Sequence, residues 1–124
     1  MPQTRIEYSS NIIDVIDTNN LFLTIHKKIH SICDIPLKNC KSGISIITNF
    51  YIGDGNENSG FVHAEIRFLE GREERLKQKL GEEILKILKK KFEKSLKELD
   101  IQITVLIEDL PRNYYFKHPK GTFT

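Results

Sequence analysis

Pro2 is the residue whose position favours chemistry most directly, because it becomes the N-terminus once Met1 is removed. Methionine aminopeptidase removes Met1 readily when the following side chain is small. The α-amino group of a chain has a pKa near 7.7–8.0, and burial or nearby cations lower it. A general base works best when its pKa lies near the operating pH. Pro2 is therefore a candidate general base, although a proline before a strand also has a purely structural interpretation.

The other reactive side chains form no complete site in the sequence. Cys33 and Cys40 are separated by six residues, which fits no common zinc or redox motif, so reduced structural thiols are expected. His26 and His30 are four residues apart, but no acid or cysteine nearby completes a metal-ligand set. His63 is expected to be satisfied by neighbouring side chains. The sequence therefore predicts no metal and no cofactor.

Composition sets the class of protein. The chain has 124 residues, 39% of them apolar and 29% charged, which is typical of one globular domain spanning residues 1–124. No apolar run reaches the roughly 20 residues of a membrane-spanning helix. The first residues lack a signal-peptide pattern, so a cytoplasmic protein without a membrane partner is expected. The net charge of +2 gives no reason to expect nucleic-acid binding.

The elements that must position Pro2 follow from hydrophobic periodicity in two similar halves, about 1–60 and 61–124. The first half predicts a strand over 4–8, a helix capped by Thr18 or Asn19 and stopped by Pro36, and a strand over 42–52. A turn-rich connector, 53–60, follows. The second half predicts a strand over 62–68, a long amphipathic helix over 72–99 and a strand over 101–107.

Two strand–helix–strand units with long crossovers imply parallel pairing within each unit. The prediction is an α/β fold in which two βαβ units form one four-stranded sheet with both helices on one face. The other sheet face, with His63, Glu65 and Arg67 as candidates to line it, would be left uncovered. Oligomerisation is the economical way to cover it.

Several short motifs occur together along the chain, and their order and spacing are more specific than any one of them. They are Met1-Pro2 before 6–9, Asn11-Ile12, 35–37, Asp54-Gly55, 61–63, Gly71-Arg72, Gly81-Glu82 and Phe116-Lys117. With these motifs the sequence resembles the 5-carboxymethyl-2-hydroxymuconate Δ-isomerase family of the tautomerase superfamily. The resemblance implies the tautomerase/MIF-like fold and a homotrimer whose sheets pack around a central axis.

The resemblance also implies a cofactor-independent proton transfer in an unsaturated 2-hydroxy or 2-oxo carboxylate, with Pro2 as the general base. A small carboxylate substrate needs cations to orient it. Arg72 matches the arginine of the family's Gly-Arg motif and is the expected substrate-binding residue, with Lys41 as a second. Phe50 and Tyr51 are expected either to wall the pocket or to pack in the core.

The chain departs from the family pattern after Pro36-Leu37, where the family has two arginines. Lys41 stands at the first position and Gly43 at the second. Lysine keeps the charge but lacks the planar fork that grips a carboxylate bidentately. Glu70 adds an anion close to Arg72 in sequence. These differences concern the choice of substrate more than the fold.

Two other functions remain open at this stage. One is tautomerisation of a different enol, such as an aryl-pyruvate enol, which the replacements at 41 and 43 suggest. The other is a non-catalytic trimeric structural or binding protein, which a retained Met1 would favour. A nucleic-acid-binding role for the lysine-rich helix is disfavoured because its Glu and Lys residues are paired at i, i+4, as on a solvated helix face.

Overall fold

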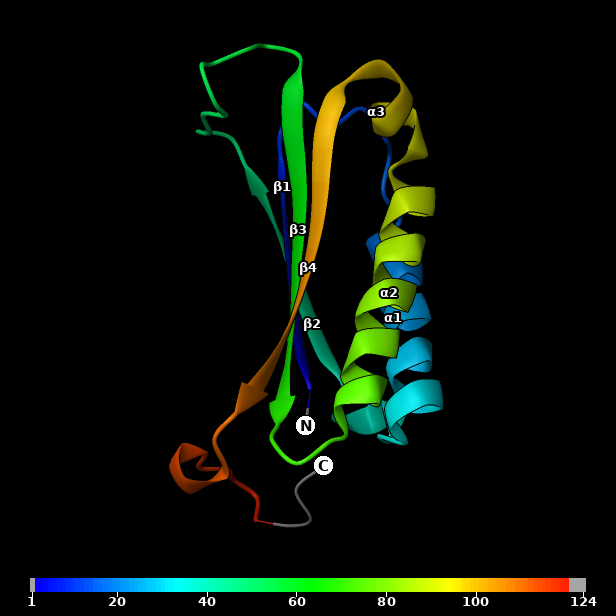
Figure 1. Cartoon of the computed structure of the whole chain (residues 1–124), viewed down its shortest axis with the longest axis vertical. Coiled ribbons are helices and arrows are strands. Elements are labelled where there is room, and N and C mark those ends of the chain that lie inside the picture. Colours follow the sequence, from blue (N-terminus) through cyan, green and yellow to red (C-terminus); the bar gives the residue numbers. More distant parts are fainter. Residues whose placement is uncertain (1, 121–124) are drawn as a thin grey trace.

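A computed structural model describes residues 2–120, and within that range the fold is the predicted one. A four-stranded sheet has the order β2-β1-β3-β4 and carries its helices on one face (Figure 1). The strands are β1 (Gln3–Ser9), β2 (Lys41–Ile47), β3 (Ser59–Leu69) and β4 (Asp100–Leu110). The helices are α1 (Thr18–Cys33), α2 (Glu74–Lys91) and the short α3 (Glu93–Glu98), with single 3₁₀ turns at Leu37–Asn39 and Arg112–Tyr114.

Pairing in the sheet confirms the two βαβ units. β1 pairs with β2 and β3 pairs with β4 in parallel, while β1 and β3 meet antiparallel at the centre. The two halves therefore run in opposite directions, so the start of β1 lies at the same end of the sheet as the end of β3. This places residues near Pro2 beside the loop that follows Leu69.

The core lies between the sheet and the helices. Alternate residues of β3 are fully buried there, as are residues one turn apart on α1 and α2, because each element turns one apolar face inward. The buried set includes Ile6, Leu21, Ile25, Ile29, Val62, Ala64, Ile66, Phe68, Leu80, Ile84, Leu88 and Phe92. The opposite sheet face carries His63, Glu65 and Arg67, as predicted.

Three predicted boundaries were wrong. The strand predicted over 42–52 ends at Ile47, because its partner β1 ends at Ser9 and the ladder has no further residue to pair with. The N-cap predicted at Thr18 or Asn19 is instead Asp17, whose side chain accepts a hydrogen bond from the Asn20 N–H, so that α1 begins at Thr18.

The helix predicted over 72–99 begins at Glu74 and is interrupted at Phe92. Two contacts account for the interruption. The buried Phe92 ring packs edge-on against Tyr8 with 5.5 Å between ring centroids. Beyond it, the Asp14 carboxylate accepts hydrogen bonds from the N–H groups of Lys94 and Ser95. This competing cap, supplied from the loop after β1, begins a new helix.

Candidate active site at the N-terminal end of β1

Pro2 and Lys41 lie together where the two strands of the first unit begin. Pro2 is buried, and its carbonyl oxygen accepts a hydrogen bond of 3.2 Å from the Lys41 N–H. Lys41 is the first residue of β2, and its side chain is exposed. The parallel pairing of β1 with β2 thus brings two residues 39 positions apart into direct backbone contact.

Arg72 reaches the same corner from the second unit. Its guanidinium carbon lies 5.0 Å from the centre of the Phe68 ring, and its Nη1 donates to the Leu69 carbonyl oxygen at 3.2 Å. In the antiparallel register Gln3 faces Arg67, so the next residue along β3, Phe68, lies opposite Pro2. Arg72 is therefore fixed on the strand segment that faces Pro2. In Figure 1 the start of β1 lies at the same end of the sheet as the loop from β3 to α2.

Two buried thiols line the helix side of this corner. Burial raises the pKa of the Cys33 thiol at the end of α1, and the nearby Arg72 charge partly offsets that rise. Burial also raises the pKa of the Cys40 thiol just before β2. Both cysteines are unbridged. Protonated, buried thiols are poor nucleophiles and poor metal ligands, which agrees with the predicted structural role.

The Glu70 carboxylate, expected from the sequence to lie near Arg72, bonds to the C-terminal segment. One Glu70 carboxylate oxygen accepts a 2.7 Å hydrogen bond from the Arg112 N–H, and the Glu70 carbonyl oxygen accepts one of 3.0 Å from Arg112 Nε. Arg72 keeps its own contacts with Phe68 and Leu69. No sequence pattern links Glu70 to Arg112, 42 positions away, so sequence reasoning missed this pairing.

Gly43 lies beside an arginine of the neighbouring strand. A Cβ atom at Gly43 would lie 3.5 Å from Nη1 of Arg5, the residue opposite it on β1. The Arg5 side chain therefore lies against the open backbone of Gly43. A guanidinium group is still present next to this position, although it comes from the neighbouring strand.

The other predicted site residues lie elsewhere or have structural partners. Phe50 packs edge-on against Phe61, and Tyr51 is 77% exposed in the loop between β2 and β3. That loop lies at the far end of the sheet from Pro2 (Figure 1), so within this chain the two aromatic residues wall no pocket with Pro2. His26 bonds to Ser42, and His30 bonds to the Ile35 carbonyl oxygen.

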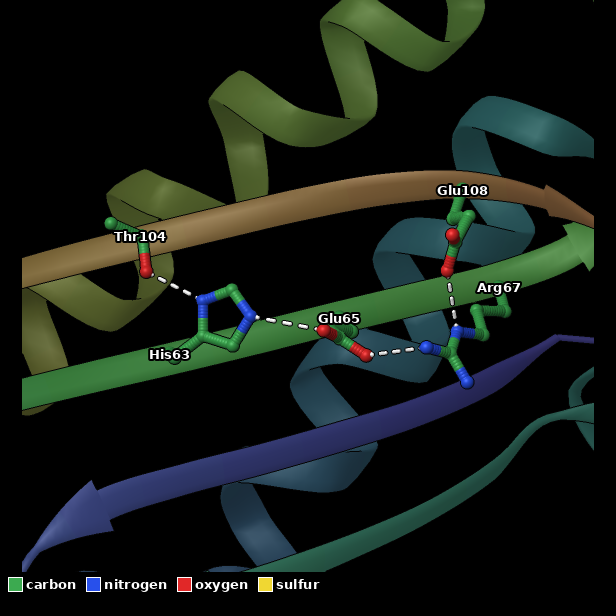
Figure 2. A network of polar contacts seen from close by, with 5 residues as sticks. All are labelled: His63, Glu65, Arg67, Thr104 and Glu108. Atoms are coloured by element: carbon green, nitrogen blue, oxygen red, sulfur yellow. Dashed lines mark hydrogen bonds and ion pairs between the residues drawn. The ribbon is translucent and has the colours of Figure 1, made fainter.

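His63 belongs to a polar network on the helix-free face, shown in Figure 2. Its ring bonds to Thr104 at 2.6 Å and to Glu65 at 3.2 Å, so neighbours satisfy it as expected. Glu65 also pairs with Arg67, which bonds to Glu108 at 2.6 Å. The network ties β3 to β4 and occupies the polar groups of a face that no helix or strand within residues 2–120 covers.

The comparisons with known proteins agree with the predicted family and fold. The sequence profile of the 5-carboxymethyl-2-hydroxymuconate isomerase family matches residues 2–120. The chain belongs to this family. A relative from Escherichia coli, 5-carboxymethyl-2-hydroxymuconate Delta-isomerase, is 24% identical over 117 residues, or 94% of this chain and 93% of the relative. Family membership makes the protein an isomerase.

Solved structures of the tautomerase superfamily share the fold. A 5-carboxymethyl-2-hydroxymuconate isomerase from Deinococcus radiodurans R1 superposes with a TM-score of 0.86 at 18% identity, covering 94% of this chain and 87% of that one. A fused 4-OT symmetric trimer gives 0.75 at 11% identity, covering 97% and 94%. A macrophage migration inhibitory factor-like protein from Entamoeba histolytica gives 0.67 at 14% identity, covering 94% of each chain.

Proposed function

We propose that this isomerase moves a proton within an unsaturated 2-hydroxy or 2-oxo carboxylate, using Pro2 as the general base after Met1 is removed. The observation that carries the proposal is the meeting of Pro2, Lys41 and Arg72 at one corner of the sheet. The Escherichia coli relative is named for a reaction on a substrate of this kind. The activity needs no cofactor, because a proton and a double bond only change position.

The chemistry follows from the two kinds of group at the corner. The Pro2 amine removes the proton of the 2-hydroxyl group, the electrons shift along the diene, and the same proton returns at a distant carbon. The product is an α,β-unsaturated 2-oxo acid with the same atoms as the dienol. Burial disfavours the charged form of an amine, so the position of Pro2 suits a neutral base near pH 7.

Arg72 and Lys41 have different tasks in this proposal. Arg72 is fixed by Phe68 and Leu69, so its remaining N–H groups can grip a carboxylate in a set geometry. Lys41 offers a single flexible ammonium group on the exposed start of β2. Two cations stabilise both the bound carboxylate and the negative charge that develops on the 2-oxygen.

We further propose a homotrimer. The helix-free sheet face is lined by the network of Figure 2, and β4 forms the edge of the sheet. Beside that edge, β4 and α2 border a hollow of about 740 Å³, lined by Gly81, Leu85, Ile103, Val105 and Ile107 among others. A sheet face and a strand edge of this kind suit pairing with further copies of the chain. The structure of the fused 4-OT protein is described as a symmetric trimer.

The protein is also expected to act inside the cell on a free small molecule. None of the helices in residues 2–120 is long and apolar enough to cross a bilayer.

A second candidate activity, on an aryl-pyruvate enol, is favoured by Lys41 and Gly43, because one bidentate clamp of the family pattern is missing. Rates on a dicarboxylate enol and a monocarboxylate enol, compared side by side, distinguish the two activities.

The decisive experiment is ketonisation of a 2-hydroxymuconate-type dienol, followed by ultraviolet absorbance, with protein shown by intact mass to lack Met1. Pro2→Ala should lower kcat by at least about 10²-fold, the contribution of a general base. Pro111→Ala, at an exposed proline after β4, is the matched control and should leave the rate unchanged. A preparation that retains Met1 should also be inactive, because its Pro2 nitrogen is a non-basic amide. Equal rates near the buffer background for all variants would favour the non-catalytic trimeric binding protein.

A further inference from the structure

The C-terminal segment brings a second guanidinium group to the loop that carries Arg72. Beyond the last pair of β3 and β4, the Glu70 N–H donates to the Leu110 carbonyl oxygen at 3.0 Å. The Arg112 N–H then donates to the Glu70 carboxylate, and Arg112 Nε donates to the Glu70 carbonyl oxygen. Three hydrogen bonds therefore hold Arg112 against the loop between β3 and α2.

Arg112 and Arg72 are fixed on consecutive carbonyl groups of this loop. Arg72 bonds to the Leu69 carbonyl oxygen and Arg112 to that of Glu70. A Cβ atom at Gly71 would lie 3.7 Å from Nη2 of Arg112, and the φ of +117° at Gly71 also disfavours other residues. The two side chains are therefore anchored to neighbouring peptide groups of one loop.

The outer edge of the Arg112 guanidinium is available to a ligand. Its Nε is used by Glu70, but within residues 2–120 neither Nη1 nor Nη2 has a hydrogen-bond acceptor, and the side chain is exposed. The bond at Nε limits how the planar group can turn, so its Nη groups are presented in a restricted orientation. A guanidinium held in this way is suited to a carboxylate.

We propose that Arg112 binds a second carboxylate of the substrate and thereby makes the enzyme prefer dicarboxylate over monocarboxylate 2-oxo acids. This inference rests on the proposed function, since Arg72 is taken to hold the first carboxylate. Glu70 positions Arg112 and, by its own charge, weakens the attraction that Arg112 exerts on an anion. Arg112 thus compensates for the planar cation that is absent at Lys41.

The test measures binding, which does not depend on the chemistry of Pro2. We would titrate the Met1-processed protein with 2-oxoadipate and with 2-oxohexanoate, two 2-oxo acids of equal chain length that differ in the terminal carboxylate. Arg112→Ala should weaken binding of 2-oxoadipate about tenfold, as expected for a lost charge-assisted hydrogen bond, and leave 2-oxohexanoate unchanged. Arg75→Ala, at an exposed arginine that pairs with Glu73, is the control and should change neither.

A purely structural role for Arg112 gives a different result. Two of the three bonds to the loop use backbone groups of Leu110 and Arg112, so Arg112→Ala retains them. Glu70→Gln keeps an acceptor oxygen but loses the charge, and should tighten 2-oxoadipate binding alone. Equal losses for both ligands in Arg112→Ala, or a wild-type protein that does not prefer 2-oxoadipate, would overturn the proposal. Failure of the Pro2→Ala experiment would leave this binding result unaffected, so the two proposals fail separately.

Discussion

The two ends of the sheet share one backbone arrangement and differ in chemistry. At one end the first residue of β2 bonds to the residue before β1, with 3.2 Å from the Lys41 N–H to the Pro2 carbonyl oxygen. At the other end the first residue of β4 bonds to the residue before β3, with 2.9 Å from the Asp100 N–H to the Asn58 carbonyl oxygen. Both hydrogen bonds arise because the βαβ unit is repeated.

The two ends differ in the hydrogen bonds that their charged side chains form. At the far end both carboxylate oxygens of Asp14 accept hydrogen bonds from the first turn of α3, and the buried Ser95 hydroxyl bonds to the same carboxylate. At the Pro2 end Arg72 and Arg112 are each held by a backbone carbonyl and keep further donors. Charge at the far end stabilises the fold, whereas in the proposed function charge at the Pro2 end binds the substrate.

The largest expected effect comes from Arg72→Ala. Removing this guanidinium should lower kcat/KM on a dienol about 10²-fold, because a lost donor to developing negative charge typically costs that much. The free energy of unfolding should change by less than about 1 kcal/mol, the value of an exposed cation–π contact. Steady-state kinetics and urea denaturation measure the two quantities. An unchanged rate together with a large loss of stability would mean that Arg72 stabilises the fold and does not bind the substrate.

Asp14→Ala should show the opposite pattern. It removes acceptors for two helix N–H groups and a buried hydroxyl, so the free energy of unfolding should fall by about 2 kcal/mol. The rate per folded molecule should not change, because Asp14 lies at the far end. Asp17→Ala is the matched control, since it removes one N-cap bond of 3.1 Å at α1 and should cost about 1 kcal/mol. An activity loss larger than the stability loss would contradict the separation of the two ends.

Lys41→Arg should increase activity at the Pro2 end, whereas Arg72→Ala should decrease it. A planar guanidinium at the start of β2 restores the bidentate clamp of the family pattern and should raise kcat/KM for a dicarboxylate enol up to about tenfold. Lys38→Arg, three residues earlier on the exposed 3₁₀ turn, should have no effect. No gain for Lys41→Arg would remove position 41 from the binding site.

Periodicity in the sequence predicted the strands, the parallel pairing and the one-sided helices. Such patterns report local burial, since the alternation of Val62, Ala64 and Ile66 depends only on which face is covered. Periodicity did not predict the break at Phe92, because the cap of α3 comes from Asp14, which lies 80 positions before Lys94. Contacts formed by the tertiary fold leave no local pattern.

The same limit applies to the candidate site. The resemblance to the family named Pro2, Arg72 and Lys41, and the fold brings them to one corner. Nothing in the sequence pointed to Arg112, whose place depends on pairing with Glu70, 42 positions away. Glu70 was expected to stand near Arg72 because sequence distance was the only guide to its neighbours.

The smallest expected effect concerns pH at the Pro2 end. Burial lowers the pKa of His26 on α1, whose Nε2 lies 2.6 Å from the Ser42 hydroxyl near the start of β2. The unfolded chain therefore binds this proton more readily than the folded protein does. Stability from neutral His26 is present above the unfolded pKa near 6.5 and is lost as the pH falls through the lowered folded pKa.

Between pH 7.5 and about 5.5 the wild-type Tm should therefore fall more than that of His26→Gln, whose side chain does not titrate. The protection factor against amide hydrogen exchange, which corrects for the slower intrinsic exchange in acid, should fall more at Ser42 than at Ser95, since the far end is held by Asp14 and not by this histidine. His118→Gln, in the exposed C-terminal segment, should follow the wild-type profile. Equal falls in the protection factors of Ser42 and Ser95 would mean that protonation of His26 loosens the whole fold, and that the two ends are not independent in stability.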